Sequence, residues 1–105
     1  MSPDDIQDMF AALGTVSVKK MFGGKGVYSD GMIIAVEVDG DILLKADAAS
    51  APDFAAAGCR QWTYDGKKGP VKMPYWSIPD SALDDPGEMS RWARLAKDAA
   101  LRSRK

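Results

Sequence analysis

Apolar side chains recur along the chain with two different periods, and each period predicts a different kind of element. Near the N-terminus they are spaced by three or four residues, as on one face of an α-helix. Ser2 is a suitable N-cap, Pro3 suits the first helical position and Gly14 is a typical helix stop. We therefore expect a helix over residues 2–13 whose buried stripe is Ile6, Met9, Phe10 and Leu13.

The next segment changes to the patterns of β-strands. Ser29-Asp30-Gly31 and Asp39-Gly40 are sequences typical of tight hairpin turns, and apolar runs flank both of them. Two such turns indicate an antiparallel meander. The expected strands are residues 16–20, residues 27–28, Met32–Val38 and residues 41–46.

Helical spacing returns in the alanine-rich segment from Asp47 to Gly58. Ser50 is expected to cap this middle helix, with Pro52 in its first turn, and Gly58 is expected to end it. Polar and aromatic residues then flank a glycine- and lysine-rich turn. The two strands expected there are residues 61–64 and residues 71–73.

Two prolines interrupt the pattern before the last helix. Pro74 and Pro79 bracket residues 75–78, which we expect to be an edge strand or an extended loop, because proline cannot donate to a central ladder. Asp80 begins a short helical turn, and Asp85 caps a final helix. The apolar face of that helix comprises Met89, Trp92, Ala93, Leu95, Ala96, Ala99 and Ala100.

This order of elements predicts an α+β fold, with an antiparallel β-sheet meander flanked by N-terminal, middle and C-terminal helices. Apolar residues make up 46% of the chain and charged residues 28%, as in soluble globular proteins. Neither a repeat nor a linker interrupts the sequence. We expect a single domain over residues 1–105, with a frayed basic tail at about residues 102–105.

The composition also narrows the possible chemistry. The chain has no histidine, which excludes a Ser–His–Asp triad and a Cys–His dyad. Its one cysteine, Cys59, is interpreted as a small buried thiol, and Asp30, Asp39 and Asp41 as turn formers without calcium-loop spacing. We expect no catalytic residue, no cofactor and no metal site. No apolar run approaches a membrane span, the acidic start lacks a signal core, and a cytoplasmic location is expected.

The glycine-rich segment of residues 19–30 raises the question of a phosphate site. A P-loop requires a hydroxyl residue after its lysine and a helix after that, whereas Gly26 follows Lys25 here and a strand comes next. No βαβ unit surrounds the segment, which also excludes a dinucleotide fingerprint. We therefore predict that Gly23, Gly24 and Gly26 shape a bulge and a tight connection between two strands.

Aromatic and basic residues suggest where a partner could bind. Trp62, Tyr64, Tyr75 and Trp76 cluster in one part of the chain, among Lys67, Lys68 and Lys72. This arrangement suits either core anchors beside a solvated turn or stacking on nucleic-acid bases. The net charge of −1 favours the first reading. Two explanations also exist for the basic residues of the C-terminal helix. They could stabilise the negative end of the helix dipole, or they could form a docking surface.

Several segments together resemble the TfoX N-terminal-domain family, which is named for a regulator of natural competence. The matching stretches are KMFGGKGVY (residues 20–28), LKAD (44–47), FAAAG (54–58), MPYW (73–76) and WARLA (92–96). The resemblance implies an antiparallel sheet flanked by helices. It also implies a link to transcription of competence genes, as a coactivator rather than a reader of DNA sequence. It brings no catalytic residues.

The resulting hypothesis is a non-enzymatic, cytoplasmic binding module that contacts proteins, including the transcription machinery. The candidate contact residues are Lys19, Lys20, Lys25, Lys67, Lys68, Tyr75 and Trp76. One alternative is direct nucleic-acid binding by the basic tail and the lysine loop. Another is a small-ligand or enzymatic domain that uses Asp, Tyr, Lys or Cys59. A homodimer formed by edge pairing of residues 75–78 is a further possibility.

Overall fold

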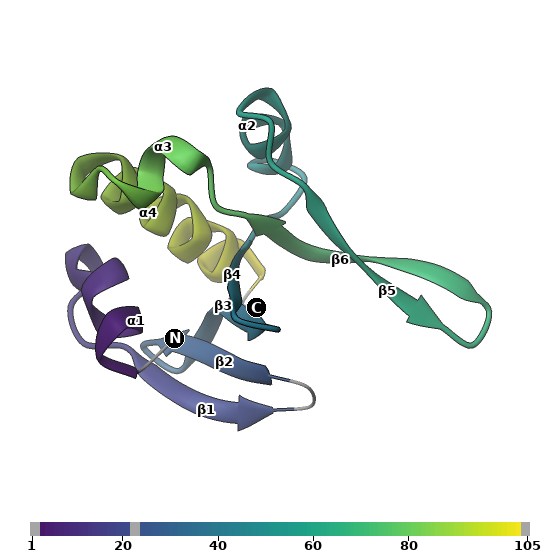
Figure 1. Cartoon of the computed structure of the whole chain (residues 1–105), viewed down its shortest axis with the longest axis horizontal. Coiled ribbons are helices and arrows are strands. Elements are labelled where there is room, and N and C mark those ends of the chain that lie inside the picture. The colour runs from purple at the N-terminus through teal and green to yellow at the C-terminus, as the bar shows by residue number, and fades with distance from the viewer. Residues whose placement is uncertain (1–2, 22–23, 104–105) are drawn as a thin grey trace.

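The computed structural model describes residues 3–21 and 24–103, which form a sheet with helices on one side (Figure 1). Its strands have the spatial order β1-β2-β3-β4-β6-β5, and all neighbours are antiparallel. The expected α+β class is confirmed. The helices are α1 (Pro3–Met9), the 3-10 helix η1 (Ala11–Leu13), α2 (Ala51–Ala56), α3 (Asp80–Leu83) and α4 (Pro86–Ser103). The strands are β1 (Ser17–Met21), β2 (Gly24–Ser29), β3 (Met32–Val38), β4 (Asp41–Lys45), β5 (Gln61–Gly66) and β6 (Gly69–Ser77).

The long helix α4 is the centre of the buried core. It lies against β3 and β4, and α1, η1 and α3 pack around it. The ring of Phe54 on α2 is 4.8 Å from that of Trp92 on α4 and 6.2 Å from that of Trp76 on β6. The predicted apolar face of the helix is confirmed, since all its members are buried except the partly buried Leu95.

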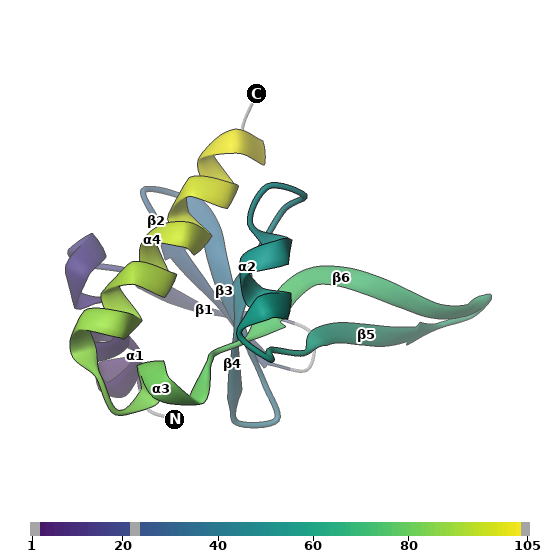
Figure 2. The ribbon, with the colours of Figure 1, turned by 90° about the horizontal axis from the view of Figure 1, so that it is seen from above.

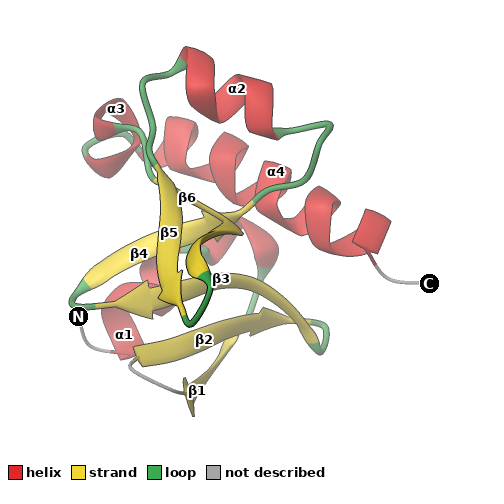
Figure 3. Ribbon diagram, turned by 90° about the vertical axis from the view of Figure 1, so that its right-hand side faces the viewer, coloured by secondary structure: helices red, strands yellow, loops and turns green. Residues whose placement is uncertain are grey.

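Strand register assigns the side chains of the sheet to two faces. Val27, Ala35, Leu44 and Trp76 lie opposite one another across four strands, and all belong to or pack against the core under the helices. Residues one position away point to the other face, which we call the helix-free face because every described helix lies on the core side (Figure 3). The residues in register on the helix-free face are Lys19, Gly26, Val36, Leu43 and Ser77.

The two Asp-Gly sequences form the hairpin turns that they predict. Asp30 and Gly31 have φ values of +52° and +79°, and Asp39 and Gly40 have +51° and +86°. Positive φ at both central residues is the requirement of the hairpin turn whose twist matches the flanking strands. The meander of β2, β3 and β4 is therefore confirmed.

The expectation of an edge strand or extended loop for residues 75–78 is wrong. The last three residues of β6 pair with β4, while Gln61 of β5 pairs with Trp76 from the other side. Pro74 is accommodated because the register with β5 is irregular beside it, so its missing amide interrupts no regular pair, while its carbonyl oxygen accepts a hydrogen bond from the Ala46 amide at 2.9 Å. A homodimer through residues 75–78 therefore has no free edge to use.

One of the two helix caps predicted within the described residues is present, and the other is not. Asp85 caps α4, because its Oδ1 accepts hydrogen bonds from the amides of Gly87 and Glu88 at 2.9 and 3.3 Å. The Ser50 hydroxyl makes no capping bond to α2, contrary to the prediction, and accepts one from the Asp47 amide instead. Helix α2 nevertheless begins directly after Ser50, and Gly58 follows its end with a φ of +79°.

The C-terminal end of α4 includes part of the basic tail. Arg102 and Ser103 belong to the helix. Residues 104 and 105 lie outside the described residues, as does the predicted cap Ser2.

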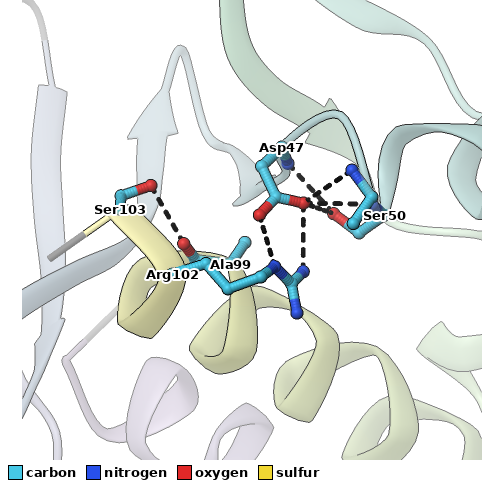
Figure 4. Close-up of polar contacts among 6 residues, drawn as sticks. Asp47, Ser50, Ala99, Arg102 and Ser103 are labelled. Carbon is cyan, nitrogen blue, oxygen red and sulfur yellow. Dashed lines mark hydrogen bonds and ion pairs between the residues drawn. The ribbon is translucent and has the colours of Figure 1, made fainter.

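One carboxylate anchors this last helical turn to the loop between β4 and α2 (Figure 4). Asp47 accepts hydrogen bonds from Arg102 Nε at 2.6 Å and from Arg102 Nη2 at 3.0 Å. Its Oδ1 also accepts one from the Ser50 amide at 3.0 Å. The hydrogen bonds from Arg102, more than any other group, hold the pKa of Asp47 well below its usual range.

The first prediction concerns the close approach of β2 and β3. A Cβ on Gly24 would lie 1.8 Å from the backbone oxygen of Glu37, so Gly24→Ala requires the two strands to separate. We expect a loss of about 2–3 kcal/mol in the free energy of unfolding, measured by urea denaturation. Gly87→Ala is the matched control, since its Cβ would approach one side-chain atom, Asp85 Oδ1 at 3.3 Å, and no backbone atom. Equal effects of both substitutions would contradict the prediction.

The second prediction concerns the ion pair of Asp47. Because its pKa is depressed in the folded state, the pair stabilises the fold above the ordinary aspartate pKa of 3.8 and loses this contribution as the pH falls below it. Arg102→Gln should therefore lower the thermal midpoint at neutral pH, and the difference from wild type should shrink in acid. Arg94→Gln, at an exposed arginine of the same helix, should change little. A difference for Arg102→Gln that is the same at all pH values would refute this interpretation.

Candidate binding face

The described residues of the glycine-rich segment belong to strands β1 and β2 and the turn that follows them. Gly24 and Gly26 lie in β2, which pairs with β1 on one side and β3 on the other. Both require glycine because of space: Gly24 faces the backbone of Glu37, and a Cβ on Gly26 would lie 2.9 Å from the ring of Tyr28. Gly24 and Gly26 are in regular register with both neighbouring strands, and the irregularity between β2 and β3 lies beyond them, between Val27 and Tyr28. Gly23 lies outside the described residues.

The space above Gly26 is filled by an aromatic side chain on the helix-free face. The ring of Tyr28 lies over this glycine, with the sulfur of Met21 beside it. The Nζ of Lys19 is 5.2 Å from the centre of the same ring, within the range of a cation–π contact. The glycine therefore positions an aromatic ring and a cation next to each other.

A second pair of rings continues this arrangement toward β5. The rings of Trp62 and Tyr75 are 6.4 Å apart. Burial raises the pKa of Tyr75, and the phenol of Tyr28 raises it further. We call Tyr28, Trp62 and Tyr75 the aromatic cluster of the helix-free face.

The candidate lysines lie on the two outer strand pairs. Lys19, Lys20 and Lys25 belong to β1 and β2, with Lys20 directly opposite Lys25. Lys67 and Lys68 form the exposed tip between β5 and β6. Both strand pairs extend from the body of the molecule in the same direction (Figure 1). The structure thus gathers these lysines at one end of the fold.

The two candidate aromatics are placed differently from the lysines. Tyr75 is only 8% exposed, and Trp76 is half-buried on the core side against Phe54. Alanine at either position would damage packing before it affected a partner. Sequence reasoning passed over Tyr28 as a contact residue. A glycine two positions before an aromatic residue in a strand was the available signal, because the two share a face.

A separate groove of about 930 Å³ lies where the end of the sheet meets α2, α3 and α4. Cys59 lies in its wall, half-buried and packed against the core. Burial raises the pKa of its thiol, the Ser77 hydroxyl opposes this, and the Asp80 carboxylate adds to it. The thiol is therefore protonated at neutral pH, but Cys59 is only half-buried, so it is less enclosed than the buried thiol expected from the sequence. The other charged groups of the wall are Asp41, Arg60, Glu88 and Arg91.

The described residues contain neither a metal-binding cluster nor a membrane-spanning helix. Among residues 3–21 and 24–103, no group of three or more Cys, Asp or Glu side chains could hold a metal ion. Within the same part of the chain, no helix is long and apolar enough to cross a membrane.

The comparisons with known proteins give the family of this chain. The family model described as the TfoX N-terminal domain matches residues 8–100, so the chain belongs to the TfoX N-terminal domain family. A curated relative is Protein Sxy of Escherichia coli (strain K12), which is 26% identical over 99 residues. The match covers 93% of this chain and 47% of Protein Sxy, so the chain spans about half the length of that relative. The resemblance seen in the sequence motifs is confirmed.

The third prediction concerns the reactivity of Cys59. Alkylation by iodoacetamide at neutral pH should be slower than for a free cysteine peptide, because only the thiolate reacts. Asp80→Asn removes a charge that raises the pKa, so it should shift the pH profile of alkylation to lower pH. Asp84→Asn, a nearby exposed carboxylate outside the groove wall, serves as control. A Cys59 that reacts faster than the free peptide would contradict the prediction.

Proposed function

We propose that this chain is a non-enzymatic binding module that contacts an acidic protein surface through its two lysine-bearing strand pairs and the helix-free face between them. In keeping with the family resemblance, the partner is a component of the transcription apparatus. The lysines provide the attraction, and the aromatic cluster provides the apolar contact.

The observation that carries this proposal is the separation of charge within a nearly neutral chain. Strands β1 and β2 hold three lysines and no acidic residue. Helix α1 holds three aspartates, and residues 80–88 hold four further acidic residues. The formal charge of −1 therefore conceals a basic end and an acidic helical side. Such an arrangement orients an acidic partner toward the strand pairs.

The aromatic cluster supports contact with a protein. Tyrosine and tryptophan are enriched at the centres of protein interfaces, where they contribute large areas at little entropic cost. Tyr28 and Trp62 are half-buried, and Tyr64 is 56% exposed. Each ring therefore retains surface for a partner while neighbouring side chains hold Tyr28 and Trp62 in position.

The groove offers less support for catalysis. Its thiol has a raised pKa, and its Glu88 and Arg91 side chains pair with each other at 3.8 Å. An activated nucleophile requires the opposite shift, or an adjacent base. This is the reason for proposing a binding role rather than an enzymatic one.

Nucleic acid is the second candidate partner, and one observation favours it. Lysines lie on both sides of rings that could stack on bases, as in proteins that bind single strands. Lys19 is already close to the ring of Tyr28, and Lys72 lies on the strand beside Thr63. Binding to duplex DNA would weaken with salt, with a log–log slope of about −0.9 for each phosphate neutralised.

The fourth prediction tests the proposed partner surface. The variants Lys19→Glu and Lys67→Glu/Lys68→Glu should each reduce recovery of a transcription component in a crosslinking pull-down from native cells. A loss of at least about tenfold in affinity for that component is expected, equal to about 1.4 kcal/mol. Arg94→Glu reverses an exposed charge on α4 and should leave binding unchanged.

Two results would count against the protein-binding proposal. One is equal loss of recovery in the Arg94→Glu control, which would show a general charge effect. The other is recovery of nucleic acid alone, with a steep salt dependence that both lysine variants abolish. That result would favour the second candidate.

A further inference from the structure

The outer part of β5 and β6, which we call the arm (residues 63–72), extends beyond the rest of the molecule. Figure 2 shows it separated from every helix and from the other strands. Tyr64 and Val71 lie opposite each other on one face and are 56% and 48% exposed. Thr63 and Lys72, on the other face, are also exposed. A two-stranded ribbon exposed on both faces is only marginally stable in water. A contact with another strand would therefore stabilise the arm.

The arm has two free edges, because β6 pairs with β4 only at its last three residues. The free part of β6 carries Pro70, Lys72 and Pro74, and the far edge of the sheet, β1, carries Lys19 and Lys20. Prolines and lysines are common protections against unwanted pairing. Strand β5 contains neither lysine nor proline, and Asp65 is its one charged residue. Of the free edges, β5 is therefore the one open to another strand, and its outer backbone groups have no strand partner in the described chain.

We propose that β5 pairs antiparallel with β5 of a second copy of this chain, about a two-fold axis at Thr63, to form a homodimer with one continuous sheet. This pairing closes on itself, since the same edge is used by both copies. It goes beyond the proposed function, because it concerns the association of the chain with itself.

The side chains of β5 favour a second copy as the occupant of this edge. Pairing about Thr63 sets Trp62 of one copy opposite Tyr64 of the other, and the two-fold axis repeats this pair. Trp62 and Tyr64 are two residues apart, so both aromatic pairs lie on the same face of the sheet. Aromatic cross-strand pairs are among the stabilising pairs of antiparallel sheets. The exposed ring of Tyr64 is thereby covered.

Charge complementarity supports the same register. Counting outward from Thr63, the Lys67 and Lys68 tip of one copy comes beside Gly58 and Cys59 of the other. The groove at that position is lined by Asp41 and Asp80, for which no ion pair is found among the described residues. Arg60 is the cation that remains there. Two carboxylates against one guanidinium leave a local excess of negative charge to meet the lysines.

The fifth prediction tests this homodimer with Thr63→Asp. Within one chain the new carboxylate lies opposite the ammonium group of Lys72, which is a favourable pair. Across the two-fold axis it lies opposite the same carboxylate of the second copy, and the two negative charges repel each other. Sedimentation equilibrium should give the wild-type chain a mass that rises with concentration toward twice 11.3 kDa. Thr63→Asp should weaken the association at least about tenfold. Ser17→Asp adds the same charge to the exposed β1 edge and should not weaken it.

Hydrogen exchange provides a second measurement that does not depend on a variant. In wild type, amides of residues 62–65 should exchange more slowly as the protein concentration rises into the dimeric range. A wild-type chain that stays monomeric at millimolar concentration would overturn the proposal. So would a dimer that Thr63→Asp leaves intact, or one that Ser17→Asp disrupts instead.

Discussion

Packing of a single sheet face beneath α4 is the interaction on which the rest of the structure depends. Four of the buried residues on this helix are alanines, namely Ala93, Ala96, Ala99 and Ala100. Small side chains allow the helix to approach β3 and β4 closely, and Trp92 fills the space toward α2. One helix thus supplies burial for the middle of the sheet only. The outer strand pairs extend past it, which leaves the helix-free face and the arm exposed to partners.

The same arrangement explains why net charge is a poor guide to this molecule. Acidic residues gather on the short helices and helix starts, where carboxylates favour the positive ends of helix dipoles. Lysines gather on strands and turns that no described helix covers. The position of each charged residue has a local cause, but together these positions give the molecule a basic end. A surface of this kind can recognise an acidic partner while the whole chain stays close to neutral.

Local chemistry made much of the fold predictable. The Asp-Gly turns, the β3 strand and the cap at Asp85 follow from interactions within a few residues, and all three are present. What could not be predicted depends on contacts between distant segments. Pro74 fits in a central strand because the register with β5, a strand formed by another segment, is irregular beside it. The order of strands that makes β5 an edge has no local signal either.

On the candidate binding face, too, features with a local cause could be predicted and features that depend on distant contacts could not. Lysines on turns and edge strands were recognised from the sequence, since such positions are exposed in most folds. Tyr75 was expected at the surface, but its neighbour Trp62 and the sheet beneath enclose it. Gly26 leaves space for the ring of Tyr28, and this role can be recognised only when the register of β1, β2 and β3 is known.

Strand β6 belongs to two structures at once. Its last residues are bonded to β4 inside the core, and its first residues form half of the arm. Because β6 is one continuous strand, it joins the arm directly to the contact between Trp76 and Phe54. The outermost point of the molecule and its interior are therefore parts of the same strand. Trp62 and Trp76 both lie at the inner end of the arm, where Gln61 pairs with Trp76, so their indole rings are placed to report optically on the point where the arm joins the core.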